Sequence, residues 1–174
     1  MPEIIIVAGP NGAGKTSFAR QYLVSARTNA TFVNADEIAR KLRDDIKPQV
    51  RRDIEAARRM LQQMDALASA RQSFAIETTL SALTYVGKIA AWRESGYRVT
   101  LIYLRLPSAD HAVERVRRRV VAGGHGIPED TVRRRFELGL LYLEKYYKSA
   151  VDEWYILDSH EGNYVLAEKS PSND

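Results

Sequence analysis

A glycine-rich turn near the start of the chain limits what this sequence can fold into more than any other stretch. The residues from Gly9 to Thr16 read GPNGAGKT and match the pattern G-x-x-x-x-G-K-[ST] at every fixed position. The apolar run before them has the β-branched content of a strand buried on both faces, and residues 17–23 after them have a helical pattern. An ordinary βα turn with a chance Lys-Thr pair would not explain the motif together with both flanks.

The residue types of this turn suit a nucleoside triphosphate. Backbone N–H groups of a glycine-rich loop can curl around phosphate oxygens, and the following helix adds partial positive charge at its N-terminus. We expect the Lys15 ammonium to reach the β- and γ-phosphates and the Thr16 hydroxyl to bind Mg²⁺. The sequence therefore predicts ATP and Mg²⁺ as cofactors. The residues expected to bind them are Gly9, Pro10, Asn11, Gly12, Ala13, Gly14, Lys15, Thr16 and Ser17.

Composition narrows the class of protein. The chain has 174 residues, of which 45% are hydrophobic and 28% charged, which predicts one domain over residues 1–170 with a frayed tail at 171–174. It contains no cysteine, so disulfides and cysteine zinc sites are excluded. It has neither a membrane-length apolar run nor a signal-peptide pattern, which favours a cytoplasmic protein without a membrane partner.

The net charge of +4 invites a nucleic-acid interpretation. We disfavour it, because much of the positive charge lies in arginine clusters on predicted helices, with acidic residues interspersed among several of them. A phosphate-handling enzyme also needs cations around its cleft.

Two further predicted strands end near carboxylates. A short strand at 31–34 is followed by Asp36, and a strand from Ser73 ends at Glu77, followed by Thr78 and Thr79. Parallel α/β sheets bind ligands at the carboxyl ends of their strands, so we expect Asp36, Glu77 and Thr79 to face the phosphate loop. Purely structural roles stay open: Asp36 as the N-cap of its helix, and the Glu77 region held by backbone donors with hydroxyls capping a helix from Ser81.

Periodicity supplies the other elements. It predicts helices at about 50–71, 81–94 and from Ser108 as N-cap, strands at 97–104 and 153–158, and an edge strand at 163–168 joined by a hairpin. The expected apolar stripe of the long helix is Ile54, Ala57, Leu61, Met64 and Leu67.

An arginine-rich connection follows the fourth predicted strand. Gly123, Gly124, His125 and Gly126 lie between two helices that carry Arg115 to Arg119 and Arg133 to Arg135. The small residues suggest a mobile lid, and lid arginines can stabilise charge that develops during phosphoryl transfer. A solvated arginine face is the ordinary alternative, and His125 either touches substrate or only sits in the loop.

Four segments in this order resemble the zeta toxin family. They are the loop 9–16, the segment VNADEIA at 33–39, the strand end IETTLS at 76–81, and RRRVVAGGHGIP at 117–128. The resemblance covers residues 3–147 and implies a nucleotide-kinase-like P-loop fold, an α/β domain with five parallel strands, helices on both faces and a short arginine-rich lid. It also implies transfer of the ATP γ-phosphate to a sugar hydroxyl of UDP-N-acetylglucosamine, with an antitoxin protein that covers the ATP cleft.

The resemblance assigns roles to positions of this chain. Asp36 would deprotonate or orient the acceptor hydroxyl, with Lys15 at the phosphates, while Glu77 and Thr79 would bind the acceptor. The lid arginines would be among Arg115, Arg118, Arg119 and Arg134. This lid is shorter and differs from that of the well-studied toxins. A kinase for another metabolite or antibiotic, a polynucleotide-end kinase and a nucleotide-switched binding module are the alternatives.

Overall fold

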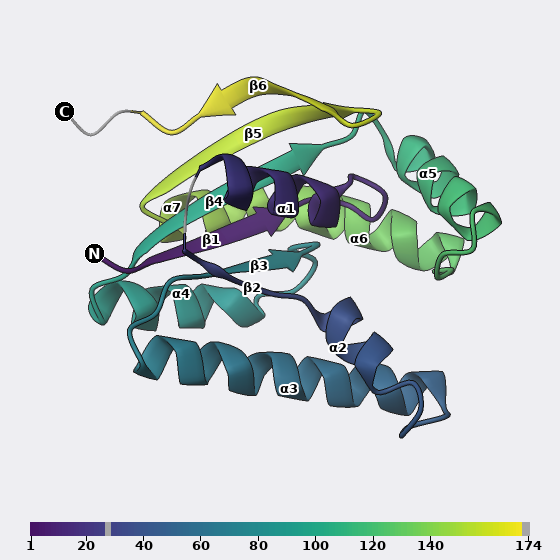
Figure 1. The fold of residues 1–174 in the computed structure, drawn as a ribbon. Helices are drawn as coiled ribbons and strands as arrows, with labels where there is room; N and C mark the ends of the chain where they lie inside the picture. Colours follow the sequence, from purple (N-terminus) through teal and green to yellow (C-terminus); the bar gives the residue numbers. More distant parts are fainter. Residues whose placement is uncertain (27–28, 172–174) are drawn as a thin grey trace.

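One six-stranded sheet forms the centre of the molecule. The computed structural model describes residues 1–26 and 29–171, with the strands in the order β2-β3-β1-β4-β5-β6 (Figure 1). The first five strands in this order are parallel, and β6 pairs antiparallel with β5. The predicted parallel sheet and its C-terminal hairpin are thus confirmed. The strands are β1 (Glu3–Ala8), β2 (Thr31–Val33), β3 (Phe74–Thr78), β4 (Arg98–Arg105), β5 (Glu153–His160) and β6 (Asn163–Lys169).

Helices cover both faces of the sheet, as predicted (Figure 1). Alternate residues of β1 point to opposite faces: Ile4 and Ile6 pack with α3, α4 and η1, while Ile5 and Val7 pack with α1 and α5. This burial on both sides explains the continuous apolar run of β1. The helical segments are α1 (Lys15–Ser25), α2 (Ala35–Lys41), α3 (Gln49–Ser69), α4 (Thr84–Glu94), α5 (Ala109–Val121), α6 (Glu129–Tyr142), the π-helical η1 (Leu143–Tyr147) and α7 (Lys148–Ala150).

The predicted apolar stripe of α3 is confirmed in its C-terminal half, where Met64 is buried and Leu61 and Leu67 pack against the core, and is wrong in its N-terminal half. Ile54 is 66% exposed, and Ala57 is exposed too. Besides Met64, the buried positions of α3 are Arg52, Ala56 and Met60. The arginine can be buried because its guanidinium donates to the carbonyls of residues 46 and 47, so its charged head keeps hydrogen-bond partners while its stem packs.

Helix boundaries follow the capping chemistry. Ser108 caps α5 by accepting a hydrogen bond from the His111 N–H, as predicted. Helix α4 starts at Thr84, three residues after the predicted start at Ser81, and the Thr78 hydroxyl accepts a hydrogen bond from Leu80 N–H in the segment before it. No helix within the described ranges has the length and hydropathy to span a membrane. Residues 172–174 of the predicted frayed tail lie outside the described residues.

Candidate active site

The glycine-rich loop follows β1 and leads directly into α1. Gly9 and Gly14 have φ angles of +146° and +82°, which favour glycine. A Cβ on Gly9 would lie 2.5 Å from the carbonyl oxygen of Leu104, so the loop passes too close to β4 for any larger residue. Gly9, Pro10 and Ala13 are buried, whereas Ser17 is exposed on the first turn of α1. The loop therefore presents the N-terminus of a helix to the carboxyl edge of the sheet.

Lys15 folds back over its own loop. Its ammonium donates to the carbonyls of Gly9 and Pro10, at 2.9 Å and 3.0 Å. Burial lowers the pKa of Lys15 to about 8, and the charges of Arg119 and Arg135 push it in the same direction. The carboxylates of Glu77 and Asp36 oppose this lowering of the pKa. The ordinary pKa of a lysine amine is 10.5, so burial makes the charged form of Lys15 much less favourable. A phosphate partner would stabilise that charged form.

Glu77 lies beside the loop at the end of β3. The Thr16 hydroxyl donates to Glu77 Oε2 over 2.7 Å. Burial raises the pKa of Glu77, while the Thr16 hydrogen bond and the Lys15 charge lower it. A hydroxyl and a carboxylate are the oxygen ligands that Mg²⁺ prefers, so these two residues fit a magnesium ion that arrives with phosphates. Within the described residues, no three acidic, histidine or cysteine side chains form a separate metal cluster.

Asp36 lies in the first turn of α2, but it is not the N-cap. Asn34 caps this helix: its Oδ1 accepts from the backbone N–H groups of Asp36 and Glu37, at 2.7 Å and 3.2 Å. Glu37 forms an ion pair with Arg20 of α1. The capping alternative for Asp36 is therefore wrong, and its carboxylate lines the cleft close enough to influence Lys15 and Glu77.

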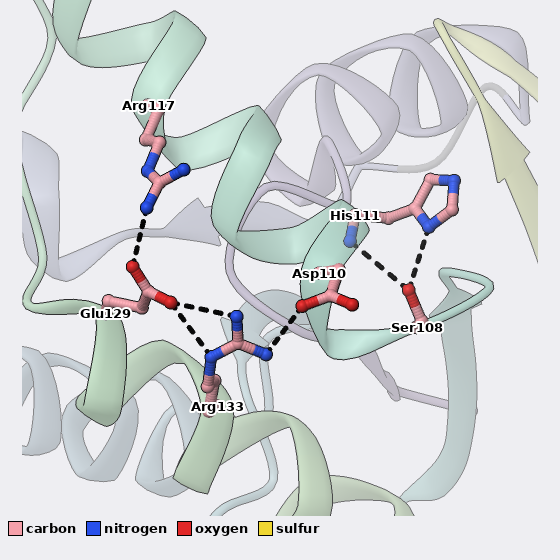
Figure 2. A network of polar contacts seen from close by, with 6 residues as sticks. All are labelled: Ser108, Asp110, His111, Arg117, Glu129 and Arg133. Atoms are coloured by element: carbon pink, nitrogen blue, oxygen red, sulfur yellow. Dashed lines mark hydrogen bonds and ion pairs between the residues drawn. The ribbon is translucent and has the colours of Figure 1, made fainter.

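Helices α5 and α6 flank residues 122–128, which the sequence predicts to be a lid, and ion pairs tie the two helices together on one side (Figure 2). Arg133 of α6 contacts Asp110 of α5 at 2.7 Å and Glu129 at 2.8 Å, and Arg117 of α5 contacts Glu129 at 2.7 Å (Figure 2). These exposed pairs add little to stability one by one, but together they fix the relative orientation of the two helices.

Other arginines of the same helices line the cleft. Arg115 donates to the Gly12 carbonyl at 3.4 Å, Arg119 to the His125 carbonyl at 3.0 Å, and Arg118 forms an ion pair with Glu161 at 3.3 Å. Arg134 is exposed and is not among the residues that line the cleft, whereas its neighbour Arg135 is.

These elements enclose one cleft of about 1070 Å³. Among the sequence-predicted residues, it brings together Asn11, Gly12, Gly14, Lys15, Thr16, Ser17, Asp36, Glu77, Thr79, Arg115, Arg118, Arg119 and His125. Thr79 is engaged with the Ser81 hydroxyl at 2.7 Å. Lining residues that sequence reasoning missed include Asn34, Arg40, Arg43 and Arg52, and Arg135 takes the place in the cluster 133–135 that the sequence assigned to Arg134. The spacing of Arg40 and Arg43 from Asp36, about one and two helical turns, is the signal that could have indicated two of them.

The sheet order, the glycine-rich loop and the cleft at the strand ends define an α/β P-loop domain of the kinase-like class. A family model described as an AAA domain, AAA_33, matches residues 4–144, and the chain belongs to this family. An uncharacterized protein of Haemophilus influenzae is 30% identical over 138 residues, which cover 77% of this chain and 92% of that protein.

Several solved structures share the fold at low identity. One from the PezAT chromosomal toxin–antitoxin system of Streptococcus pneumoniae has a TM-score of 0.70 and 17% identity, covering 100% of this chain and 74% of that chain. A putative kinase from Chloroflexus aurantiacus has a TM-score of 0.62 and 19% identity, and the match covers 77% of this chain and 79% of that chain. A chain of the Pnkp1/Rnl/Hen1 RNA repair complex has a TM-score of 0.67 and 22% identity, and the match covers 83% of this chain and 46% of that chain.

Proposed function

We propose that this protein is a kinase that transfers the γ-phosphate of Mg·ATP to a hydroxyl group of a small acceptor. One arrangement carries the proposal: Lys15, the Thr16–Glu77 pair and Asp36 lie in one cleft that the lid arginines also line. A site that only bound a nucleotide would need the loop and the metal-side pair but not the second carboxylate, Asp36, whereas transfer to a hydroxyl uses such a group. The proposal places the protein in the cytoplasm, where ATP is plentiful.

The donor half of the cleft has a clear division of labour. Loop N–H groups and Lys15 hold the phosphates, and Thr16 with Glu77 holds Mg²⁺. A magnesium ion held there would supply positive charge close to the phosphates. The Thr16–Glu77 hydrogen bond therefore favours a metal-side role for Glu77 rather than the acceptor contact expected from the sequence. Arg119 and Arg135 are close enough for their charges to lower the pKa of Lys15, and they stabilise the negative charge of the phosphoryl group during its transfer.

The acceptor half of the cleft is built on α2 and α3. Asp36 orients the acceptor hydroxyl and accepts its proton, which is the role that kinases give to an aspartate. Arg40, Arg43 and Arg52 line the cleft beyond it. This positive surface suits an acceptor that carries its own phosphates, so UDP-N-acetylglucosamine is our first candidate. The resemblance to zeta toxins supports that choice, and an antitoxin that covers the ATP cleft is the matching partner.

The test is incubation with Mg·ATP and UDP-N-acetylglucosamine, followed by mass spectrometry of the sugar nucleotide. We expect a gain of one phosphate with the wild type and none with Lys15→Ala. Arg134→Ala is the matched control, because Arg134 is charged and exposed but lies outside the cleft lining. ATP consumption without phosphorylated sugar nucleotide would reject this acceptor and direct the same assay to other metabolites and hydroxylated antibiotics.

A polynucleotide end is the second candidate acceptor. The cleft-lining arginines favour it, and the fold likeness extends to a chain of an RNA repair complex. Such an acceptor predicts that oligonucleotide binding weakens steeply as salt rises, since several phosphates release counterions. A sugar nucleotide has fewer charges and predicts a much shallower dependence.

A further inference from the structure

We propose that Ser159 of β5 is a positioning residue for nucleotide binding, because its hydroxyl fixes one peptide unit of the phosphate-binding loop. The Ser159 hydroxyl donates to the carbonyl oxygen of Ala13 at 2.9 Å, and Ser159 is 1% exposed. The two residues are 146 positions apart, so only the folded sheet brings them together. The inference rests on the proposed function in one respect: the loop must bind phosphate.

The contact acts on the loop through peptide geometry. The Ala13 carbonyl and the Gly14 N–H belong to the same peptide unit, in which C=O and N–H point in opposite directions. Ser159 holds the carbonyl on the side of the β5–β6 hairpin, so the Gly14 N–H is directed away from the hairpin, toward the cleft that Gly14 lines. Loop N–H groups with this orientation are the ones that bind phosphate oxygens.

The loop needs such a restraint because of its residue types. Gly14 has φ of +82°, and glycine populates both signs of φ readily, so the peptide unit before it can flip at low cost. Ala13 is fully buried, and the described hydrogen bonds give its carbonyl no partner other than Ser159. Without that hydroxyl, a flipped carbonyl would gain water as a partner from the cleft, and the N–H would be withdrawn from it.

Tyr164 of β6 supports the same part of the loop. Its hydroxyl donates to the Gly14 carbonyl at 3.2 Å, and its ring packs edge-on against Phe18 with 4.9 Å between centroids. The Gly14 carbonyl also accepts from Phe18 N–H at 2.9 Å, so Tyr164 reinforces an orientation that α1 already sets. The hairpin thus contacts two successive loop carbonyls, but Ser159 alone holds the first.

The experiment compares Ser159→Ala, Ser159→Thr and Ser170→Ala by calorimetric titration with Mg·ATP and with inorganic triphosphate. Triphosphate isolates the loop, because it has neither base nor ribose. Ser170 is the matched control: it lies just beyond β6, and its hydroxyl accepts from the Trp154 N–H at 3.2 Å. We expect Ser159→Ala to lower the affinity for both ligands by about tenfold or more. The affinities of Ser159→Thr are expected to stay within about threefold of wild type, and Ser170→Ala is expected to change neither affinity.

Three results would overturn the inference, and a fourth would contradict the proposed function on which it rests. A folded Ser159→Ala variant that binds both ligands like the wild type rejects it, as do equal losses in the Ala and Thr variants. Should the Ala variant not fold, the near-isosteric Ser159→Cys, whose thiol donates weakly, decides the matter: it must also weaken triphosphate binding. A wild type that binds neither ligand contradicts the proposed function instead.

Discussion

The Thr16 hydroxyl and the Glu77 carboxylate lie 2.7 Å apart, although 61 positions separate them in the chain. The sheet register explains the contact: β1 and β3 are parallel neighbours with Val7 opposite Glu77, so the loop after β1 passes beside the end of β3. The Thr16 hydroxyl, which we propose as a magnesium ligand, and the Glu77 carboxylate therefore lie side by side, next to Lys15.

This relationship predicts the effect of Glu77→Gln. The amide keeps the size and a hydrogen-bond acceptor for Thr16 but removes the charge that favours a divalent ion. We expect ATP binding without magnesium to change little, while the magnesium-dependent gain in ATP affinity falls by roughly tenfold to a hundredfold. Titrations with and without magnesium measure both. The same substitution at exposed Glu137 of α6 is the control, and an unchanged magnesium dependence in Glu77→Gln would reject the metal-side role.

The lowered pKa of Lys15 predicts that ATP affinity depends on pH. Phosphate binding requires the ammonium form, and the nucleotide-free protein loses that proton as the pH rises through about 8. We therefore expect ATP affinity to be level below this pH and to fall above it, by up to about tenfold per pH unit. Binding measured from pH 7 to 9.5 tests this, with Lys15→Met expected to bind weakly and without the same dependence. An affinity that stays level across the range in wild type would contradict it.

The lowered pKa of Lys15 also predicts how the stability of the nucleotide-free protein depends on pH. Stability is expected to rise with pH, whereas ATP affinity is expected to fall. Between the folded pKa of about 8 and the ordinary pKa of 10.5, the unfolded chain binds more protons at Lys15, so the contribution of Lys15 to stability rises with pH. Below pH 8 the full cost of burying the charge is present. Lys15→Met is therefore expected to stabilise the nucleotide-free protein at pH 7 by about 1–2 kcal/mol, allowing for partial exposure. Urea unfolding gives the value, and a less stable variant at pH 7 would count against this account.

Asp36 and Glu37 are adjacent carboxylates with different surroundings, which makes them a matched pair. Asp36 lines the cleft, whereas Glu37 pairs with Arg20. We expect Asp36→Asn to bind Mg·ATP like the wild type and to lose phosphoryl transfer by about a hundredfold or more, because we assign its carboxylate to the acceptor hydroxyl and not to the nucleotide. Glu37→Gln is expected to retain transfer. Undiminished phosphoryl transfer by Asp36→Asn in a fixed-time assay would show that Asp36 has no part in the mechanism.

Neighbouring arginines of α6 give a similar comparison. Arg135 lines the cleft and its charge reaches Lys15, while Arg134 is exposed outside the lining. We expect Arg135→Ala to lower kcat by about a hundredfold and Arg134→Ala to leave it within about twofold. A larger loss of kcat in Arg134→Ala than in Arg135→Ala would instead support Arg134, the arginine that the sequence resemblance places in the lid.

The parts of the site that the sequence predicted depend on local patterns. The P-loop motif and its flanking elements place Lys15 and Thr16, and the carboxyl ends of two further strands place Asp36 and Glu77 in the same cleft. The C-terminal hairpin followed from its turn residues and periodicity in the same way.

The parts that it missed depend on contacts between distant elements or on small rotations of a helix. Arg134 and Arg135 differ by one step around α6, and the apolar stripe does not determine which one reaches the cleft. Arg52 of α3 is buried because carbonyls before that helix accept its hydrogen bonds, and hydropathy counts it as a surface residue. The bond from Ser159 to Ala13 has no local signal at all.

The most direct test of the kinase mechanism follows the γ-phosphate itself. ATP whose γ-phosphate carries heavy oxygen is incubated with the protein, magnesium, UDP-N-acetylglucosamine and a panel of hydroxylated metabolites, and products are read by mass spectrometry. The account predicts that wild type places the labelled phosphate on an acceptor hydroxyl and that Asp36→Asn and Lys15→Ala do not. Label that appears only in inorganic phosphate, whatever acceptor is present, would contradict it and identify a nucleotide-hydrolysing switch instead.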